Sequence, residues 1–282
     1  MREVVTRPSP LVPRLWGLAR QFVVIIGLEK IYEVSRGIVP RQSSVALTNG
    51  LKVVRLEKTW HIFDEWKVQA IVFKHAQWYV GPLVLDRTQI ISAVNHFYLY
   101  SHFLSTLAFL IWLYLWRRPH FPLVRDIIFV TTALALVSYI AFPMMPPRLM
   151  GAHMHIHGYQ FKDTLTPLIN YKLQQTQLTY NPYAAMPSLH FAWALILGMT
   201  LVLIGRDPLL RLIGLLYPVM MLATILVSGN HLLLDAVGSA IVVTIAAIVV
   251  FAAHQRPHIV ARVRRMWRPK GMSHPLSPDL HV

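Results

Sequence analysis

The sequence contains no cysteine, and only 14% of its residues are charged. Without cysteine the fold has no disulfide bond and no thiolate metal site. Soluble proteins carry about 25% charged residues, so this low content excludes an ordinary water-soluble domain. Because 55% of the residues are hydrophobic, we predict an integral membrane protein.

Acidic residues are also scarce, since 12 Asp and Glu stand against 27 Lys and Arg, for a formal net charge of +15. A basic chain can bind nucleic acid, but here the basic residues cluster at the ends of apolar runs. That placement is typical of membrane proteins, whose basic loops follow the positive-inside rule and contact anionic lipid headgroups. We therefore expect the bilayer as a partner and expect no nucleic acid.

Six apolar runs are predicted to cross the membrane, because a crossing needs about 20 residues. The five clearest runs are Gln89–Trp116, Ile127–Phe142, Leu189–Ile204, Leu209–Ser228 and His231–Ala253. The sixth, Leu15–Ile38, is weaker because charged residues interrupt its second half. The predicted fold class is all-α, a polytopic membrane bundle of about six transmembrane helices with an interfacial helix.

The interfacial helix is predicted in the stretch between the first two spans, "LKVVRLEKTWHIFDEWKVQAIVFKHAQWYVGP", which is too charged to cross a membrane. Its tryptophans and mixed charges favour a helix in the membrane interface, and an extracellular loop is the alternative. The chain then divides into an N-terminal span plus this amphipathic segment (1–88), a transmembrane bundle (89–255) and a basic tail (256–282).

Basic residues in short loops predict the orientation. They lie after the second span, after the fourth span and in the tail: Arg117, Arg118, Arg125, Arg206, Arg211, Arg256, Arg262, Arg264, Arg265, Arg268 and Lys270. With six crossings all of them share one side with the N-terminus, so both termini are expected in the cytoplasm, in the cell membrane.

Three polar clusters then fall together on the opposite, outer face. The third span ends at "FPMMPPRLM", the fourth begins at "MPSLHFAW", and the fifth is joined to the sixth by "SGNHLLLD". An acidic group inside a membrane helix costs roughly 2.5–3.5 kcal/mol on insertion scales, so Asp235 is expected there for a function.

His231 and Asp235 are four residues apart, and on a helix such side chains are neighbours. Asp235 can then accept a hydrogen bond from one ring nitrogen of His231, which fixes the tautomer and makes the other nitrogen a better nucleophile. The alternative is a buried polar pair that joins two helices.

In the second cluster, Pro187 is predicted at a helix start, with Ser188, Leu189 and His190 in the first turn. Free N–H groups and the positive end of the helix dipole make such a turn an anion site. The hydroxyl of Ser188 can add a hydrogen bond, and His190 is within reach as a proton donor. The alternative is a plain N-cap with an interfacial histidine.

In the third cluster, the paired prolines of "MMPPRL" end a helix and stiffen the turn that carries Arg148. A guanidinium group there can bind two phosphate oxygens at once. An anchor to lipid headgroups is the alternative.

Taken in order, PPRL, PSLH and NHxxxD resemble the three signature segments of the type-2 phosphatidic acid phosphatase superfamily, over about residues 122–253. The segments "NPYAAMPSLHFAW" and "GNHLLLDAVGS" are most similar to the inositol phosphorylceramide synthase branch. The phosphatase pattern has lysine, proline, glycine and arginine at four positions where this chain differs: Ala141, Leu149, Leu189 and Ile225.

The resemblance implies a role for each matching residue. His231 attacks phosphorus and forms a phosphohistidine, Asp235 orients it, and His190 protonates the leaving oxygen and then deprotonates the acceptor. Arg148 and Ser188 hold the phosphate oxygens, and we expect Asn230 to donate a replacement bond for the missing basic residues. No metal and no cofactor is implied.

Upstream, "NHFYLYSHF" is also similar to the synthase branch. Asn95, Tyr98 and His102 fall at i, i+3 and i+7, on one helical face. They are candidates for the substrate cavity, with packing of the bundle as an equal alternative.

Three functions are compatible with these features. The leading one is a phosphotransferase that moves a phosphorylated headgroup from a phospholipid donor to a lipid alcohol. In the second, water is the acceptor and the enzyme is a lipid phosphate or diphosphate phosphatase. The third is a proton-coupled transporter, although its polar groups are expected nearer mid-span. The histidines of "GAHMHIH" (His153, His155 and His157) raise zinc as a minor alternative to an exposed loop.

Overall fold

The computed structural model describes residues 43–80, 82–151, 161–165 and 182–266, and seven positions between 17 and 30. From residue 256 to residue 266 only the course of the helix is described. Most of the predicted span Leu15–Ile38 lies outside these residues, as do His153, His155 and His157.

The bundle consists of five helical segments. α4 (Arg87–His96) continues through a π-helical turn, η1 (Phe97–Ser101), into α5 (His102–Trp116), and the others are α6 (Phe121–Ala141), α9 (Leu189–Ile204), α10 (Pro208–Val227) and α11 (Leu233–Met266). Short 3₁₀ turns, η2 (Arg118–His120) and η3 (Pro147–Leu149), precede and follow α6.

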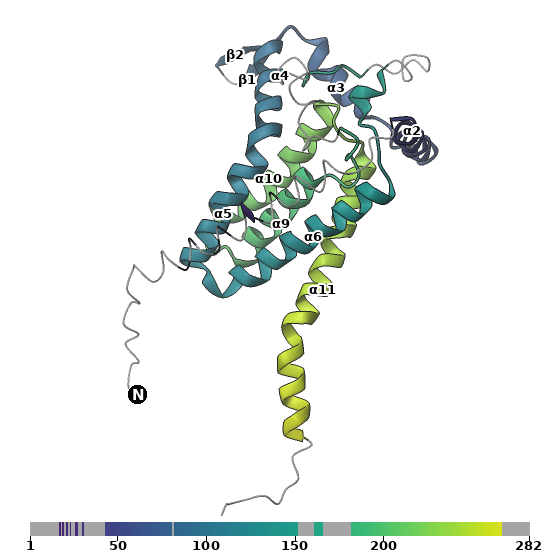
Figure 1. Ribbon diagram of the computed structural model, residues 1–282. Helices are drawn as coiled ribbons and strands as arrows, with labels where there is room; N and C mark the ends of the chain where they lie inside the picture. Colours follow the sequence, from purple (N-terminus) through teal and green to yellow (C-terminus); the bar gives the residue numbers. More distant parts are fainter. Residues whose placement is uncertain are drawn as a thin grey trace, which may run out of the picture.

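Four helices in the described residues are long and apolar enough to cross a membrane: Arg87–Trp116, Arg118–Ala141, Pro208–Val227 and Leu233–Gln255. The chain is therefore a membrane-integral protein. The remaining apolar helix, α9, has 16 residues. α11 has 34 residues and is about 50 Å long at 1.5 Å per residue. Its C-terminal half extends beyond the other helices (Figure 1).

Local sequence signals explain where several helices begin. α4 starts with a capping box, in which the backbone N–H of Asp86 donates to the Gln89 side chain over 2.9 Å. At α10 the Asp207 carboxylate caps the backbone N–H of Leu209 at 2.8 Å, and Pro208 occupies the first helical position. The run Ile127–Phe142 is short for a crossing and was expected to extend into flanking residues. α6 begins at Phe121, where Pro122 suits a first turn.

α9 is the central helix and packs against α5, α6, α10 and α11. Gly198 of α9 and Gly214 of α10 meet backbone to backbone. A Cβ at Gly198 would lie 2.4 Å from the Gly214 carbonyl oxygen. Small residues are the usual means by which membrane helices approach so closely. On the outside, large apolar side chains such as Leu203 and Ile248 are exposed, as a lipid-facing surface requires.

The predicted interfacial helix is in fact two helices and a hairpin. α2 (Ser43–Thr59) and α3 (Glu65–Lys74) are followed by strands β1 (Gln77–Val80) and β2 (Leu83–Asp86), which pair antiparallel. The break after α2 occurs at His61, whose φ of 56° is left-handed. These elements gather at one end of the bundle, and α2 is seen end-on while the bundle helices run across the view (Figure 1).

Candidate active site

The three polar clusters meet at the end of the bundle that α2 and α3 cover. The chain after α6 pairs with the segment before α9, since the backbone N–H of Met144 donates to the Tyr183 carbonyl over 2.8 Å. It also pairs with the turn between α10 and α11, where the Arg148 N–H donates to the Gly229 carbonyl over 2.9 Å. Gly229 has a φ of 67°, a conformation that favours glycine.

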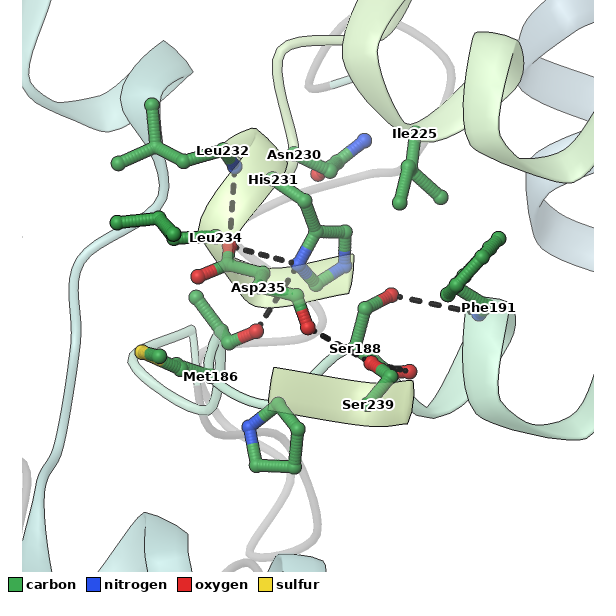
Figure 2. Close-up of polar contacts among 12 residues, drawn as sticks. Met186, Ser188, Phe191, Ile225, Asn230, His231, Leu232, Leu234, Asp235 and Ser239 are labelled. Carbon is green, nitrogen blue, oxygen red and sulfur yellow. Dashed lines mark hydrogen bonds and ion pairs between the residues drawn. The ribbon is translucent and has the colours of Figure 1, made fainter. Parts of the chain in front are cut away.

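His231 contacts two acceptors through a single ring nitrogen. Its Nδ1 lies 2.9 Å from the Ala185 carbonyl oxygen and 3.2 Å from Asp235 Oδ2 (Figure 2). A carbonyl oxygen can only accept, so Nδ1 carries the hydrogen. Nε2 is then the nitrogen with the free lone pair. This is the tautomer that a nucleophilic histidine needs.

The prediction that both residues of this pair lie on a helix is wrong for His231. α11 begins at Leu233, so His231 precedes the helix and Asp235 lies in its first turn. Asp235 Oδ2 also accepts the backbone N–H of Leu232 at 3.0 Å. The carboxylate thus closes the first turn of α11 as an N-terminal cap and orients His231 at the same time.

Ser188 is the N-cap of α9 rather than a first-turn residue, and Pro187 precedes the cap. The Ser188 hydroxyl accepts the N–H of Phe191 at 3.4 Å, and the Ser188 N–H donates to the Asp235 carbonyl at 3.3 Å (Figure 2). Ser239 of α11 donates to the Ser188 carbonyl at 2.8 Å. These bonds join the start of α9 to the start of α11.

His190 lies in a cluster of aromatic rings beside His231. The rings of His190 and Tyr98 stack with their centroids 4.0 Å apart, and the His102 ring lies 4.1 Å away. The His190 and His231 centroids are 6.2 Å apart. Tyr98 faces both histidines, since its ring centroid is also 6.4 Å from that of His231. His102 faces His190, and both residues lie on the predicted inward face.

Arg148 is 7% exposed and is held by two side chains. Its Nε donates to Asn230 Oδ1 at 2.7 Å, and one terminal nitrogen donates to Asp163 Oδ2 at 3.2 Å. Asn230 in turn donates its amide to the Ser228 hydroxyl at 2.9 Å. Asn230 thus orients the guanidinium group of Arg148. The expected role was a direct hydrogen bond from Asn230 to phosphate.

Asn95 is fully buried and holds a neighbouring segment, which agrees with the packing alternative rather than with a place in the cavity wall. Its amide donates to the Thr164 carbonyl at 2.7 Å and accepts from the Thr164 hydroxyl at 3.0 Å. Gln69 of α3 binds Lys162 in the same way, with its amide donating to the carbonyl at 3.0 Å and accepting the N–H at 2.7 Å. Two buried amides therefore hold segment 161–165, and with it Asp163, against Arg148.

Four residues near the site were missed by the sequence analysis: Glu57, Glu65, Gln69 and Asp163. The first three belong to the amphipathic segment, in which burial has no obvious signal. Exposed Asp64, for example, is next to Glu65, which is 2% exposed. The pattern of charges in the sequence does not distinguish the buried acidic residues from the exposed ones.

A family profile described as the PAP2 superfamily matches residues 53–249, more than half of the chain. The chain belongs to the PAP2 superfamily. This confirms the superfamily predicted from the motifs. The corresponding comparisons with curated proteins and with solved structures found no match.

PAP2 superfamily members are phosphatases or phosphotransferases, so this chain is an enzyme of lipid phosphates, with substrates in the bilayer. The matched range begins inside α2 and includes both α3 and the hairpin. Within the described residues, no group of three or more His, Asp or Glu side chains is arranged to hold a metal ion.

Replacing Asp235 by asparagine is expected to lower kcat by about 10- to 100-fold. Loss of the orienting carboxylate in a serine protease triad costs about 10⁴-fold, through the wrong histidine tautomer. Here the Ala185 carbonyl also holds Nδ1–H, so the tautomer should largely persist in the variant. Single-turnover kinetics in detergent measure the effect. A loss of about 10⁴-fold or more would mean that the Ala185 contact does not fix the ring.

Proposed function

We propose that this PAP2 superfamily protein is a phosphotransferase of the inositol phosphorylceramide synthase type. It would move a phosphorylated headgroup from a phospholipid to a lipid alcohol through a phosphohistidine. The observation that carries the proposal is the pair of hydrogen bonds from His231 Nδ1, 2.9 and 3.2 Å long. They direct the lone pair of Nε2 away from Asp235 and leave it for phosphorus.

In the first half-reaction, Nε2 of His231 attacks phosphorus and forms a P–N bond. The bond from phosphorus to the leaving oxygen breaks, and His190 donates a proton to that oxygen. The neutral diacylglycerol-type alcohol departs. His231 carries the phosphorylated headgroup, and its positive charge is balanced by Asp235.

In the second half-reaction, His190 takes the proton from the acceptor hydroxyl. The acceptor oxygen attacks phosphorus, the P–N bond breaks, and neutral His231 returns. Arg148 and the first-turn amides of α9 stabilise the charge on the phosphate oxygens, and such preorganised electrostatics is usually the largest catalytic term. No net proton is consumed in the cycle.

Burial of the site favours transfer over hydrolysis. His231 is 4% exposed and Arg148 is 7% exposed, so bulk water has little access to the reacting atoms. In this proposal the lipid alcohol enters from the bilayer. A phosphatase of the same superfamily would use the same residues with water as the acceptor.

The six-span topology and the orientation are part of the proposal. Both termini would be cytoplasmic and the site would open on the outer face of the cell membrane. Arg117 and Arg118 lie between α5 and α6, and Arg206 lies between α9 and α10, whereas His231 lies between α10 and α11. In a bundle that alternates in direction, these arginines are at the end opposite to His231, as the positive-inside rule expects.

The test is to incubate the purified enzyme in liposomes with a headgroup-labelled phospholipid, with and without a lipid alcohol. Label in a new lipid that requires the alcohol supports the phosphotransferase. Label released as a water-soluble phosphate, with no new lipid, supports the phosphatase. If the donor is unchanged in both arms for every headgroup offered, while the protein remains folded, the proposal is wrong.

A further inference from the structure

The first turn of α11 is surrounded by carboxyl groups from three different places. Glu57 of α2 accepts the backbone N–H of Leu234 at 2.8 Å, and Glu65 of α3 accepts that of Leu233 at 2.8 Å. Asp235 accepts that of Leu232. Three consecutive N–H groups beside His231 are thus each held by an acid.

All three acids are buried, with Glu57 at 0%, Glu65 at 2% and Asp235 at 0% exposure. In the described residues, neither glutamate forms an ion pair with a basic side chain. A helix N-terminus supplies only about half a positive charge, which cannot balance three carboxylates. Because buried like charges that share a site cannot all ionise, one of the acids must hold a proton.

Burial and the neighbouring acids favour the protonated form most strongly at Glu57. Burial raises the pKa of Glu57 to about 9, and the negative charges of Glu65 and Asp235 add to the effect. Burial also raises the pKa of Glu65, although the hydrogen bond that it accepts from the Leu233 N–H opposes the rise. In each glutamate the second carboxyl oxygen, Oε2, is buried with no hydrogen-bond partner among the described residues. The titratable groups facing the pair are Asp235 and, through it, His231.

We propose that Glu57 and Glu65 share one proton and act together as positioning residues, which hold the start of α11 so that His231 is aligned for attack. The inference deepens the proposed function and rests on it. It makes α2 and α3 a part of the catalytic apparatus, beyond their place in the membrane interface.

The shared proton gives the enzyme an alkaline limit. At neutral pH the protonated Glu57 and the Glu65 carboxylate can lie together at the helix start. When Glu57 ionises near pH 9, the two carboxylates repel each other and the capping bonds to α11 are weakened. A shift of the nucleophile by about 1 Å is enough to lower the rate about 10²-fold.

Glutamine at position 57 tests this directly, because its amide keeps an acceptor for Leu234 and a donor toward Glu65 but cannot ionise. With Glu57→Gln, the fall in kcat near pH 9 should disappear. Glu57→Ala removes the acceptor for the Leu234 N–H and should lower kcat about tenfold or more at every pH, by misplacement of the nucleophile. Asp64→Asn is the matched control, since this carboxyl lies between the two glutamates in sequence but is 58% exposed. It should leave the profile unchanged.

Thermal unfolding in detergent gives a second readout that needs no substrate. The pKa of Glu57 is higher in the folded protein than its ordinary value of 4.5. Its contribution to stability is therefore complete below pH 4.5 and is lost as pH rises toward 9. Relative to Glu57→Gln, the wild-type Tm should fall through this interval and level off above it.

An unchanged alkaline limb in Glu57→Gln, or parallel Tm curves for this variant and wild type, would overturn the shared proton. If the wild type turns over no lipid phosphate but the two Tm curves diverge as described, the proposed function fails and the proton assignment stands. If Asp64→Asn changes the fall of kcat near pH 9 as Glu57→Gln does, surface charge causes the effect and the inference is wrong.

Discussion

His231→Ala is expected to abolish turnover, with kcat reduced by at least about 10⁴-fold, as when the nucleophile of a covalent mechanism is removed. The loss is large because the alanine side chain has no nucleophile to take the place of Nε2. The fold should survive, since Asp235 still caps the Leu232 N–H. Steady-state transfer of a labelled headgroup measures the rate, and elution as a single detergent-solubilised species reports the fold.

The matched control is His96→Ala, which removes an exposed histidine of α4. Its ring contacts Ser92 and Tyr100, which lie outside the proposed site. This variant should keep wild-type activity. A His231→Ala protein that is folded and retains more than about a hundredth of the activity would rule out His231 as the nucleophile.

His190→Ala should lower kcat by about 10² to 10⁴-fold, the range for removal of a general acid and base. The size of the loss should depend on the leaving group. An aryl phosphate ester, whose phenolate leaves without protonation, should still phosphorylate His231. The covalent intermediate should then accumulate, because nothing deprotonates the acceptor. A burst of phenol followed by slow turnover is the expected time course.

His102→Phe is the comparison, because it keeps an aromatic ring beside His190, at the position now 4.1 Å away. It should cost less than tenfold and give no burst. Equal losses in His190→Ala for alkyl and aryl leaving groups would contradict a role for His190 in proton transfer.

The sequence predicted which residues meet, because topology alone brings them together. With helices that run alternately up and down, the end of the third span, the start of the fourth and the turn before the sixth must share a face. This alternation of helix directions was enough to predict that His231, Arg148 and His190 lie at the same end of the bundle. The contact between His231 and Asp235 was predictable from their spacing. The ring nitrogen that makes the contact and the contribution of the Ala185 carbonyl were not.

The sequence did not predict the roles of polar side chains that have many possible hydrogen-bond partners. Asn230 was expected to contact phosphate, and Asn95 either to line the substrate cavity or to pack within the bundle, because an amide can donate and accept in any direction. The structure gives them Arg148 and Thr164 as partners. Glu57 and Glu65 lie in the segment predicted to form one interfacial helix, whose mixed charges do not indicate which of them are buried. The turn at His61 folds α3 back, and both acids then point to α11.

The most direct test of the account is to locate the covalent intermediate. The His190→Ala protein is incubated with a ³²P-labelled aryl phosphate ester, quenched at high pH where phosphohistidine survives, digested and sequenced by mass spectrometry. The account predicts one labelled peptide, with phosphorus on Nε2 of His231, since Nδ1 is hydrogen-bonded to Ala185 and Asp235. Label on Nδ1, or on any other residue, would contradict it.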